Sequence, residues 1–501
     1  MSAVLVALVV VPLVAMIVGV VPGFQVPAWT TVVTALVCLG LSIALIVPAT
    51  DGTVTALGVL RVDALSTVFL LSATFVYAAT SIYALGYLPV QYGSASGARA
   101  DGDAQVFYRR FYLGFNAFAW SLICAPLANG MALLWVAIEI TTVVSALLVA
   151  LDATEEASEA AWKYVLIASS GLGIGLLATI FMYFAGSQVL GHSYDLAFDP
   201  LLRVAGELPH TPVRVAFLFA VVGFGTKVGL FPVHTWLPDA HAEAPTPVSA
   251  LLSGSLLATS FYAILRYEQV TSRALGENFP QIVLLVFGVL SLLLAALYLL
   301  EQRHLKRMLA YSSIEHMGIL AIGVGFGAPL ALAGVMLHVL AHAAAKANAF
   351  MGAGAIVQRY GTREILRIRD VLGRMPWTGP LFLMAVLALS AMPPFGLFRS
   401  EFQIIAGGLA STRTMVAAIL AILVTIAFGG LMISTTRMMF LPESFSADPD
   451  APTPTEEPSE TSVAMVIPVV AGICVLIMLG VYPPPALHDL ILAAASELGG
   501  R

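Results

Sequence analysis

Apolar segments of membrane-spanning length recur along almost the whole chain, and they constrain the fold more than any other feature of the sequence. A helix needs roughly 20 predominantly apolar residues to cross a bilayer. Because the bilayer core offers no water to unpaired backbone groups, such segments fold as helices. We expect about fourteen spans, near residues 2–22, 27–48, 63–87, 111–128, 131–151, 162–186, 212–231, 247–266, 280–300, 309–327, 329–358, 377–405, 413–438 and 463–482. The sequence therefore predicts an all-α integral membrane protein.

The composition supports this prediction and excludes several classes of protein. Hydrophobic residues make up 59% of the 501 residues and charged residues 10%, whereas soluble domains average about 25% charged residues. A net charge of −6 gives no basic surface, so we expect no nucleic-acid partner. Cys38, Cys124 and Cys474 stand alone in apolar runs, which favours small buried hydrophobic side chains over a redox or metal site.

The distribution of Lys and Arg predicts which way the chain crosses the membrane, because cytoplasmic loops carry an excess of these residues. Of the 23 Lys and Arg residues, thirteen lie in inner loops and eight outside if the N-terminus is outside. Only Lys227 and Lys346 then remain at membrane depth. We therefore expect a multi-pass protein with both termini on the outer side.

The seventh expected span carries a lysine at membrane depth and then breaks. Its sequence, VVGFGTKVGLFPVHTWLPDAHAEAPTPVSALLSG (221–254), places Lys227 in an apolar helix and follows it with Pro232 and Pro238. An ammonium group at a helix centre costs about 2.5–3.5 kcal/mol on insertion scales. Broken helices occur at membrane depth only where protein or a water-filled cavity covers the freed backbone groups. The stretch therefore indicates an ion pathway, and His241 lies in its broken part.

Glu139 lies near the middle of the fifth expected span. Carboxylates inside the membrane are functional by default, although a protonated carboxyl group that hydrogen-bonds within the bundle is a structural alternative. In a medium of low dielectric constant, a glutamate and a lysine change each other's proton affinity. We therefore expect Glu139 and Lys227 to act as a couple.

The eleventh expected span, GVMLHVLAHAAAKANAFMGAG, carries three titratable residues at a helical repeat. His338, His342 and Lys346 are four residues apart, so they line one helix face about 6 Å from one another. This spacing suits a proton relay, and the alternative is a polar seam packed against another helix. We expect no metal site here, since no third ligand is evident and Lys346 would repel a cation.

The twelfth expected span repeats the pattern of the seventh. In LALSAMPPFGLFRSEFQII, Pro393 and Pro394 interrupt an apolar helix just before Arg399 and Glu401. Broken helices in corresponding positions of two halves mark the inverted repeats of transporters. We therefore expect two inverted five-helix repeats, with Arg399 and Glu401 near a second ion site. An ion pair between these two residues outside the membrane is the alternative.

The repeats predict four regions of the chain. They are an N-terminal three-helix segment (1–110), a first proton-channel repeat of spans 4–8 (111–270), a second repeat of spans 9–13 (271–440), and an acidic loop with the final span (441–501).

Three further candidates lie nearer the membrane edges. Lys163 opens the sixth span four residues after Glu159, which indicates either ordinary charge pairing on a helix or the mouth of a channel. Glu315 and His316 lie two to three turns deeper than Lys306 and Arg307, where contact with water is harder to maintain. We include all three in the candidate path.

Four stretches resemble the antiporter-like membrane subunits shared by respiratory complex I, Mrp-type Na⁺/H⁺ antiporters and membrane-bound group 4 hydrogenases. They are the Glu139 helix, KVGLFPVHTWLPDAHAEAPTPVSALLSG, HLKRMLAYSSIEHMGI and the HAAAKA segment, and together they cover most of spans 4–12. The WLPDAHAEAPTPVSALL segment is highly specific. With Glu315 in it, SSIEHMGI is most similar to hydrogenase-4 component F.

The resemblance implies a proton-translocating subunit with two linked half-channels and a hydrophilic axis along the membrane midplane. In the first half, Glu139 and Lys227 match the key Glu–Lys pair of the family, and Lys163 matches the lysine at the head of the sixth span.

In the second half, His342 and Lys346 match the connecting residues of the eleventh span, and Glu401 or Arg399 takes the place of the terminal Lys or Glu. The eighth span departs from the family pattern, because it lacks the usual Lys or His. It offers only Ser255, Ala258, Thr259 and Ser260. Proton passage between the halves is therefore in doubt, or it uses His241.

We predict a proton-translocating membrane subunit of a multisubunit redox complex in the bacterial cytoplasmic membrane, not catalytic by itself. Its expected partners are other membrane subunits and peripheral redox subunits that carry iron–sulfur clusters or a nickel–iron centre. The chain has no haem, iron–sulfur or flavin signature, so no cofactor is expected in it. Three alternatives stay open: a subunit of an Mrp-type antiporter that also moves Na⁺, a membrane partner of a bicarbonate or CO2-uptake complex, and an inert anchor for a peripheral enzyme.

Overall fold

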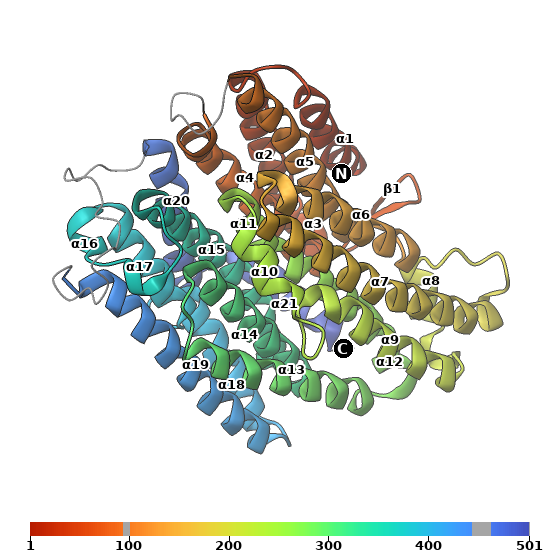
Figure 1. Cartoon of the computed structure of the whole chain (residues 1–501). Coiled ribbons are helices and arrows are strands. Elements are labelled where there is room, and N and C mark those ends of the chain that lie inside the picture. Colours follow the sequence, from red (N-terminus) through yellow and green to blue (C-terminus); the bar gives the residue numbers. More distant parts are fainter. Residues whose placement is uncertain (94–100, 443–461, 500–501) are drawn as a thin grey trace.

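The computed structural model describes residues 1–93, 101–442 and 462–499, and its regular structure is almost entirely helical (Figure 1). In these residues, eleven helices or helix runs are long and apolar enough to cross a membrane. The helices α1 (Ser2–Val18) and α17 (Thr378–Leu389) are apolar but shorter. The chain thus has the helices of a multi-pass membrane protein, although fewer of them meet this criterion than the fourteen spans expected. The predicted acidic loop lies outside the described residues.

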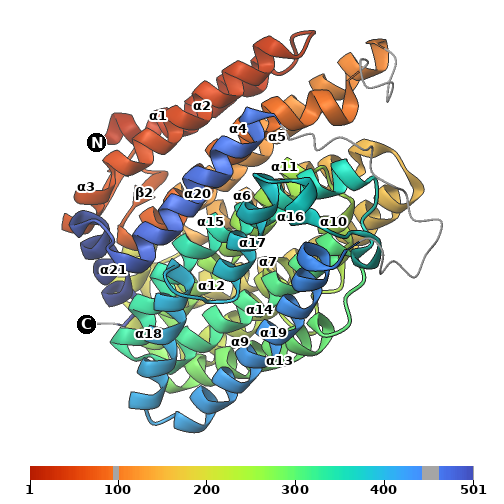
Figure 2. The same ribbon diagram turned by 90° about the vertical axis from the view of Figure 1, so that its left-hand side faces the viewer.

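The N-terminal part of the chain forms a layer at one end of the molecule. It consists of α1, α2 (Gln25–Ala44), α3 (Ile46–Asp51), β1 (Val54–Ala56), β2 (Leu60–Val62) and α4 (Ala64–Tyr92). The two short strands pair antiparallel in the register Val54↔Val62. Both views place α1 and α2 at the opposite end of the molecule from α13 and α19 (Figures 1 and 2).

The middle of the chain contains the first broken helix. Its elements are α5 (Asp101–Leu127), α6 (Met131–Val149), α7 (Glu155–Leu190), α8 (Phe198–Arg203), α9 (His210–Val228), α10 (Trp236–Glu243), α11 (Thr246–Leu251), a π-helical turn (Leu252–Leu256) and α12 (Leu257–Leu275). Short 3-10 turns span Ala150–Asp152 and Ala205–Glu207. The run from α11 to α12 is buried along its whole apolar window.

The C-terminal part contains the second broken helix. Its elements are α13 (Asn278–Leu299), α14 (Leu305–Phe326), α15 (Pro329–Tyr360), a 3-10 turn (Ile365–Arg367), α16 (Val371–Arg374), α17, α18 (Gly396–Ala410), α19 (Thr414–Phe440), α20 (Val463–Val481) and α21 (Pro485–Leu498). Helix α15 lies in the interior and packs against α4, α14, α17, α18 and α20.

Both predicted helix breaks are present, and local sequence explains them. Helix α9 ends at Gly229, whose φ of 83° is left-handed, a conformation that glycine adopts without a steric penalty. Pro232 follows and has no N–H to continue the helix. The second interruption runs from the end of α17 to Gly396 and contains Pro393 and Pro394.

Small residues let α7 and α9 pack with their backbones close together. A Cβ atom added to Gly223 would lie 2.4 Å from the backbone nitrogen of Gly175, so no larger residue fits there. Close helix approach at glycines is common in membrane bundles, because dispersion forces drive helix association there. This packing holds the end of α9, and with it Lys227, against α7.

Candidate functional site

Lys227 lies in the last turn of α9 and is fully buried. Its ammonium group donates hydrogen bonds to Thr142 Oγ1 at 2.9 Å and to the hydroxyl group of Tyr164. Its Nζ also lies 4.5 Å from the centre of the Tyr164 ring, on which Trp236 stacks. The C-terminal end of a helix carries partial negative charge, which favours a cation there. Hydroxyl groups, an aromatic face and a helix end therefore stabilise the charge of Lys227.

Glu139, on α6, faces the same region without touching the lysine. Its carboxylate interacts electrostatically with Lys227, but the described residues contain no direct ion pair between the two. Glu139 Oε1 accepts a hydrogen bond from Ser169 Oγ at 3.2 Å, whereas Oε2 is buried without a partner in the described part of the chain. A buried carboxylate oxygen of this kind is a natural position for an ordered water. The predicted couple is present as two separated groups.

Lys163 lies at the surface, away from Lys227. Its ammonium group is 2.5 Å from Glu159 Oε1, as the four-residue spacing predicts, and 3.7 Å from Asp239 Oδ2. Arg307 donates to the same Asp239 carboxylate at 2.6 Å. These four charges connect α7, α10 and α14, so Lys163 belongs to a surface network. The next residue along the chain, Tyr164, is the one that contacts Lys227.

His241, on α10, is buried between the two halves of the chain. Its Nδ1 lies 2.8 Å from the carbonyl oxygen of Leu237, and Nε2 has no partner among the described residues. The imidazole lies near the ring of Trp236 on one side and near the ring of Phe350 on the other, at 6.1 and 5.9 Å between ring centres. It also interacts electrostatically with Lys346.

The second half contains a cluster of three buried histidines. His316, from α14, meets His338 and His342, from α15, with ring centres 5.2 Å apart in both pairs. His316 Nδ1 lies 3.2 Å from His338 Nε2. The two histidines of α15 thus share one helix face, as predicted, and α14 brings the third.

Glu401 joins this histidine cluster, and Arg399 does not. The Glu401 carboxylate, on α18, lies 3.8 Å from His316 Nδ1 and is almost fully buried. Ser400, the preceding residue, lies with its Oγ 3.0 Å from His338 Nδ1. Arg399 is partly exposed, and no ion pair between it and Glu401 exists in the described residues. Of the two residues that the sequence offered for this position, the helix therefore directs Glu401 into the bundle.

Lys346 lies one helical turn from His342 and is fully buried. It donates to the carbonyl oxygen of Leu309 at 3.0 Å and to Ser312 Oγ. Glu315 lies close enough to interact with it electrostatically. Like Lys227, Lys346 is therefore a buried ammonium group bound by neutral oxygens, with a carboxylate nearby.

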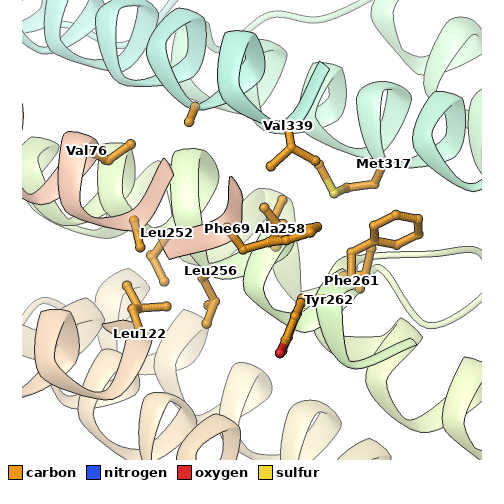
Figure 3. Packing of buried hydrophobic residues seen from close by; sticks show 14 of the residues in the cluster. Phe69, Val76, Leu122, Leu252, Leu256, Ala258, Phe261, Tyr262, Met317 and Val339 are labelled. Carbon is orange, nitrogen blue, oxygen red and sulfur yellow. The ribbon is translucent and has the colours of Figure 1, made fainter. Parts of the chain in front are cut away.

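The eighth span separates Lys227 from Lys346, and its polar contact lies earlier than expected. Figure 3 shows Ala258 packed among apolar side chains such as Phe261 and Val339. One turn earlier, in the π-helical turn, Ser253 Oγ lies 2.7 Å from Ser313 Oγ of α14. Three hydroxyl groups of this span are buried without partners in the described chain, those of Ser255, Thr259 and Ser260. The crossing between the halves is therefore polar at Ser253 and apolar at Ala258.

A polar cavity of about 250 Å³ lies at the end of the bundle at which α14 begins. Lys306 lines it and donates to the carbonyl oxygen of Ala244 at 2.9 Å, directly after α10. Glu243 and Arg363, also in the lining, form an ion pair of 2.6 Å. Burial would lower the pKa of Arg363, but the hydrogen bond to Glu243 and the charges of Glu243 and Asp152 together outweigh this effect and raise the pKa. The cavity therefore opens at the end of α10 that carries Glu243, and its lining does not include His241.

Sequence reasoning missed the neutral groups of the site. Thr142, Tyr164, Ser312 and Ser400 bind the titratable side chains directly. The available signal was helical spacing, since Thr142 lies three residues after Glu139 and Ser312 lies three before Glu315. Hydroxyl groups are common in apolar helices, however, so spacing alone does not distinguish these from others.

Chemically, the arrangement is a row of groups that can each accept and release a proton, interrupted by hydroxyl groups and by buried polar atoms without partners. Polar atoms of this kind usually bind ordered water in folded proteins. The row runs from Glu139 through Lys227, His241 and Lys346 to Glu401. Such a row can conduct protons, and nothing in it resembles a nucleophile with its base.

Comparison with known proteins gives a consistent family assignment. Residues 128–440 match the profile of a family described as NADH:quinone oxidoreductase/Mrp antiporter, TM. A protein named hydrogenase-4 component F homolog, from Methylacidiphilum infernorum, is 37% identical over 333 residues, which cover 66% of this chain and 70% of that protein. NADH-quinone oxidoreductase subunit M of Pseudomonas aeruginosa is 30% identical over 351 residues, 68% of this chain and 65% of that protein. The match thus spans about two thirds of these relatives.

Solved structures share the fold over almost the whole chain. A chain of the membrane-bound sulfane sulfur reductase, an archaeal respiratory membrane complex, has a TM-score of 0.84 at 22% identity and covers 99% of this chain and 98% of its own length. A chain of the Mrp complex from Dietzia sp. has a TM-score of 0.81 at 18% identity, with coverages of 99% and 97%.

Proposed function

The chain belongs to the NADH:quinone oxidoreductase/Mrp antiporter transmembrane family, and on this premise we propose that it is the proton-translocating membrane subunit of a multisubunit redox complex. The observation that carries the proposal is the row of titratable and hydroxyl groups from Glu139 to Glu401. Glu139 is half-buried, and the buried members of the row include Lys227, His241, Lys346, His342, His338 and Glu401. Ionisable groups are costly inside a membrane bundle and mark ion pathways when they occur there. The relatives at 30% identity or more include hydrogenase-4 components and subunits M and N of NADH-quinone oxidoreductases, which favours a redox complex.

Lys227 is the proton-loading group of the first half in this proposal. Its ammonium proton already points toward Tyr164 and Thr142, so neutral hydroxyl groups solvate it in place of water. Glu139 tunes the proton affinity of Lys227 from a distance. A carboxylate that moves closer stabilises the protonated lysine, and a carboxylate that moves away favours loss of the lysine's proton. Because the two are not in contact, a small movement of α6 or α9 suffices.

His241, Ser253 and Lys346 connect the halves. His241 Nε2 is buried and has no hydrogen-bond partner in the described chain, and the imidazole lies beside Phe350 of α15. The Ser253–Ser313 hydrogen bond continues the row into α14. There, Ser312 Oγ accepts a hydrogen bond from the ammonium group of Lys346. Ordered water next to the unpartnered hydroxyl groups completes this link.

The second half ends at Glu401 through the histidine cluster. His342 and His338 pass the proton along one face of α15, and His316 faces the Glu401 carboxylate. Glu315 stands in the second helix of its repeat, α14, as Glu139 does in α6. We therefore assign to Glu315 the role of tuning the proton affinity of Lys346, as Glu139 does for Lys227. The two pairs lie in the proposed repeats 111–270 (Glu139 and Lys227) and 271–440 (Glu315 and Lys346).

The proposal extends to the partners and the location of the chain. Other membrane subunits flank the chain, and peripheral subunits with iron–sulfur clusters or a nickel–iron centre supply the driving force. The membrane is the bacterial cytoplasmic membrane, with both termini outside. An Mrp-type cation/proton antiporter subunit is the second candidate, favoured by the family description and the fold shared with the Mrp complex.

Proton pumping by the native complex in vesicles tests the proposal. Lys227→Ala and Glu139→Ala should each abolish the electron-transfer-dependent pH gradient, reported by a pH-sensitive dye. Lys163→Gln, a surface lysine next to Tyr164, is the matched control and should retain it. Intact pumping in the Lys227 and Glu139 variants would refute the mechanism, and a gradient that requires Na⁺ would favour the antiporter.

A further inference from the structure

We propose that His316, His338 and Glu401 form a buried binding site for one divalent transition-metal ion, with Zn²⁺ as the best-fitting cation. One ligand atom from each residue lies within 4.8 Å of the other two. The three residues come from three helices, α14, α15 and α18, and all are almost fully buried. None of the roles derived above requires them to converge on one point.

Two of the three distances between ligand atoms are close to those of a tetrahedral metal centre. Two ligand atoms bound to Zn²⁺ at about 2.0–2.1 Å in tetrahedral geometry lie about 3.3–3.4 Å apart. His316 Nδ1 and His338 Nε2 are 3.2 Å apart, and His316 Nδ1 and Glu401 Oε1 are 3.8 Å apart. The first edge already fits, and the second needs a shift of a few tenths of an ångström by the flexible glutamate side chain.

Ser400 presents His338 in the tautomer that a metal ion needs. Ser400 Oγ lies 2.9 Å from the carbonyl oxygen of Leu397, which can only accept, so the hydroxyl proton points there. The same oxygen lies 3.0 Å from His338 Nδ1 and therefore accepts its proton. His338 Nε2 is left with a free lone pair directed at His316. Metal-bound histidines usually donate their second N–H to an oxygen in this way.

His316 can bind the metal ion through Nδ1, and His342 is a candidate for the fourth ligand. With His316 bound through Nδ1, its proton moves to Nε2, which is buried and without a partner in the described residues. Both ring nitrogens of His342 are likewise unpartnered there, and its ring centre lies 5.2 Å from that of His316. His342 or a water molecule can therefore take the fourth position, since zinc sites with three protein ligands keep an open one.

Charge balance also permits a dication. Lys346 repels it, which is why the α15 sequence alone argued against a metal ion. The structure adds two acidic residues from other helices, Glu401 and Glu315, which interact electrostatically with each other, and Glu315 also interacts with Lys346. Metal binding deprotonates its carboxylate ligand, so Glu401 would bind a divalent cation as a carboxylate and offset part of its charge.

Occupation of this site would block the relay, a consequence that rests on the proposed function, whereas binding itself rests on the geometry alone. A metal ion ties up the lone pairs of His316, His338 and Glu401 that proton transfer uses. Metal binding and proton binding therefore compete for the same atoms. Zn²⁺ is then expected to inhibit pumping from within the second half of the chain.

Cobalt spectroscopy on the purified native complex, without a polyhistidine tag, tests binding directly. Co²⁺ should bind with one saturable equivalent, give the intense visible absorption of a tetrahedral centre, and be displaced by Zn²⁺. Glu401→Gln and His338→Gln should each weaken binding by about tenfold or more, as loss of a ligand or its support does. Arg399→Gln, two residues from Glu401 but outside the cluster, is the matched control and should bind as the unaltered protein does.

The outcomes separate this site from the proposed function. Absence of the absorption band from the unaltered complex, or its persistence in the His316→Gln/His338→Gln double variant, would overturn the metal site whatever pumping does. This holds even if a variant folds poorly, since the first measurement uses the unaltered protein. If Co²⁺ binds at the cluster but Zn²⁺ leaves pumping unchanged, the site stands and the relay through it fails.

Discussion

The regions around Lys227 and around Glu401 both lie beside a broken helix, yet they hold charge in different ways. Lys227 precedes the break of α9 and lies in its last turn, where the helix dipole favours a cation. Glu401 follows the break of α18 and lies in its second turn, where the dipole has largely faded. The first region surrounds its charge with hydroxyl groups and an aromatic ring, and the second surrounds it with imidazoles.

This difference indicates a division of labour. Hydroxyl groups and aromatic faces do not change charge near neutral pH, so the lysine region stores a proton on one group. Imidazoles change charge readily, so the glutamate region offers several interchangeable proton positions. Loss of a single group is therefore expected to be more damaging in the first region than in the second, except at Glu401, where the row ends.

Removal of the terminal carboxylate gives the largest expected effect in the second region. Glu401→Gln keeps the shape of the side chain but cannot exchange a proton, so pumping should fall by about 10²-fold, the lower range for loss of an acid–base group. Dye-monitored proton uptake by vesicles containing the native complex measures this. Arg399→Gln should pump normally, and an equal loss in both variants would break the assignment of Glu401.

Substitution of the hydroxyl groups around Lys227 sharpens the comparison. The double variant Thr142→Val/Tyr164→Phe removes both hydrogen-bond acceptors of the ammonium group. Each hydrogen bond to a charged group contributes about 1.5–3 kcal/mol, so pumping should fall by at least about tenfold. Ser145→Ala, which removes only a neighbour of Tyr164, is the control. Unchanged pumping in the double variant would mean that water alone solvates Lys227.

Substitution within the histidine cluster should have a smaller effect. His342 has no hydrogen-bond partner in the described residues, and two other imidazoles lie beside it. His342→Gln should therefore slow pumping by about threefold to tenfold, less than a group without substitutes. Steady-state pumping rates, normalised to electron transfer, give the answer. A complete loss would show that the imidazoles are not interchangeable.

The crossing between the two regions allows a smaller test. Ser253→Ala removes the Ser253–Ser313 hydrogen bond, and a water molecule can replace the lost hydroxyl group, so pumping should fall only about twofold to threefold. Ala258→Gly, at the apolar turn of the same span, is the control. A larger loss of pumping in Ala258→Gly than in Ser253→Ala, in the same vesicle assay, would show that protons do not cross at Ser253.

A charge cluster outside both regions should affect stability and leave pumping unchanged. Asp63 binds Arg266 at 2.6 Å and also Arg61. Burial would raise the pKa of Asp63, but the two arginines outweigh it and hold the pKa well below its usual range. Its stabilisation is therefore fully present above about pH 4 and is lost as the pH falls further. Asp63→Asn should lower the free energy of unfolding at pH 7 by about 3–5 kcal/mol.

Thermal unfolding in detergent at pH 7 measures the effect of Asp63→Asn, with the exposed Asp51→Asn as its control. The difference between Asp63→Asn and the unaltered protein should stay constant down to about pH 4 and shrink as the pH is lowered below it. A difference that stays constant with pH would show that packing, and not the ion pair, accounts for it.

Several elements were predictable because their signals are local. Apolar length predicted the helices, and Gly229 with Pro232 and the Pro393–Pro394 pair predicted the two breaks, since glycine and proline act on their own backbone. The four-residue spacing of His338, His342 and Lys346 predicted their common face. The pairing of Glu159 with Lys163 followed from the same spacing. The match of the chain to its family was also evident in short, specific segments.

The sequence by itself determined the class of fold and the two helix breaks, because periodicity and composition act within one segment. Only the tertiary structure decided what these residues meet. It brought His316 and Glu401 to His338 from other helices, turned Arg399 away, and left Lys163 at the surface. It also joined Ser253 of the eighth span to Ser313 of α14, a contact that the sequence analysis did not anticipate. The physical reason is that a helix face specifies direction only after its rotation in the bundle is set, and packing against distant helices sets that rotation.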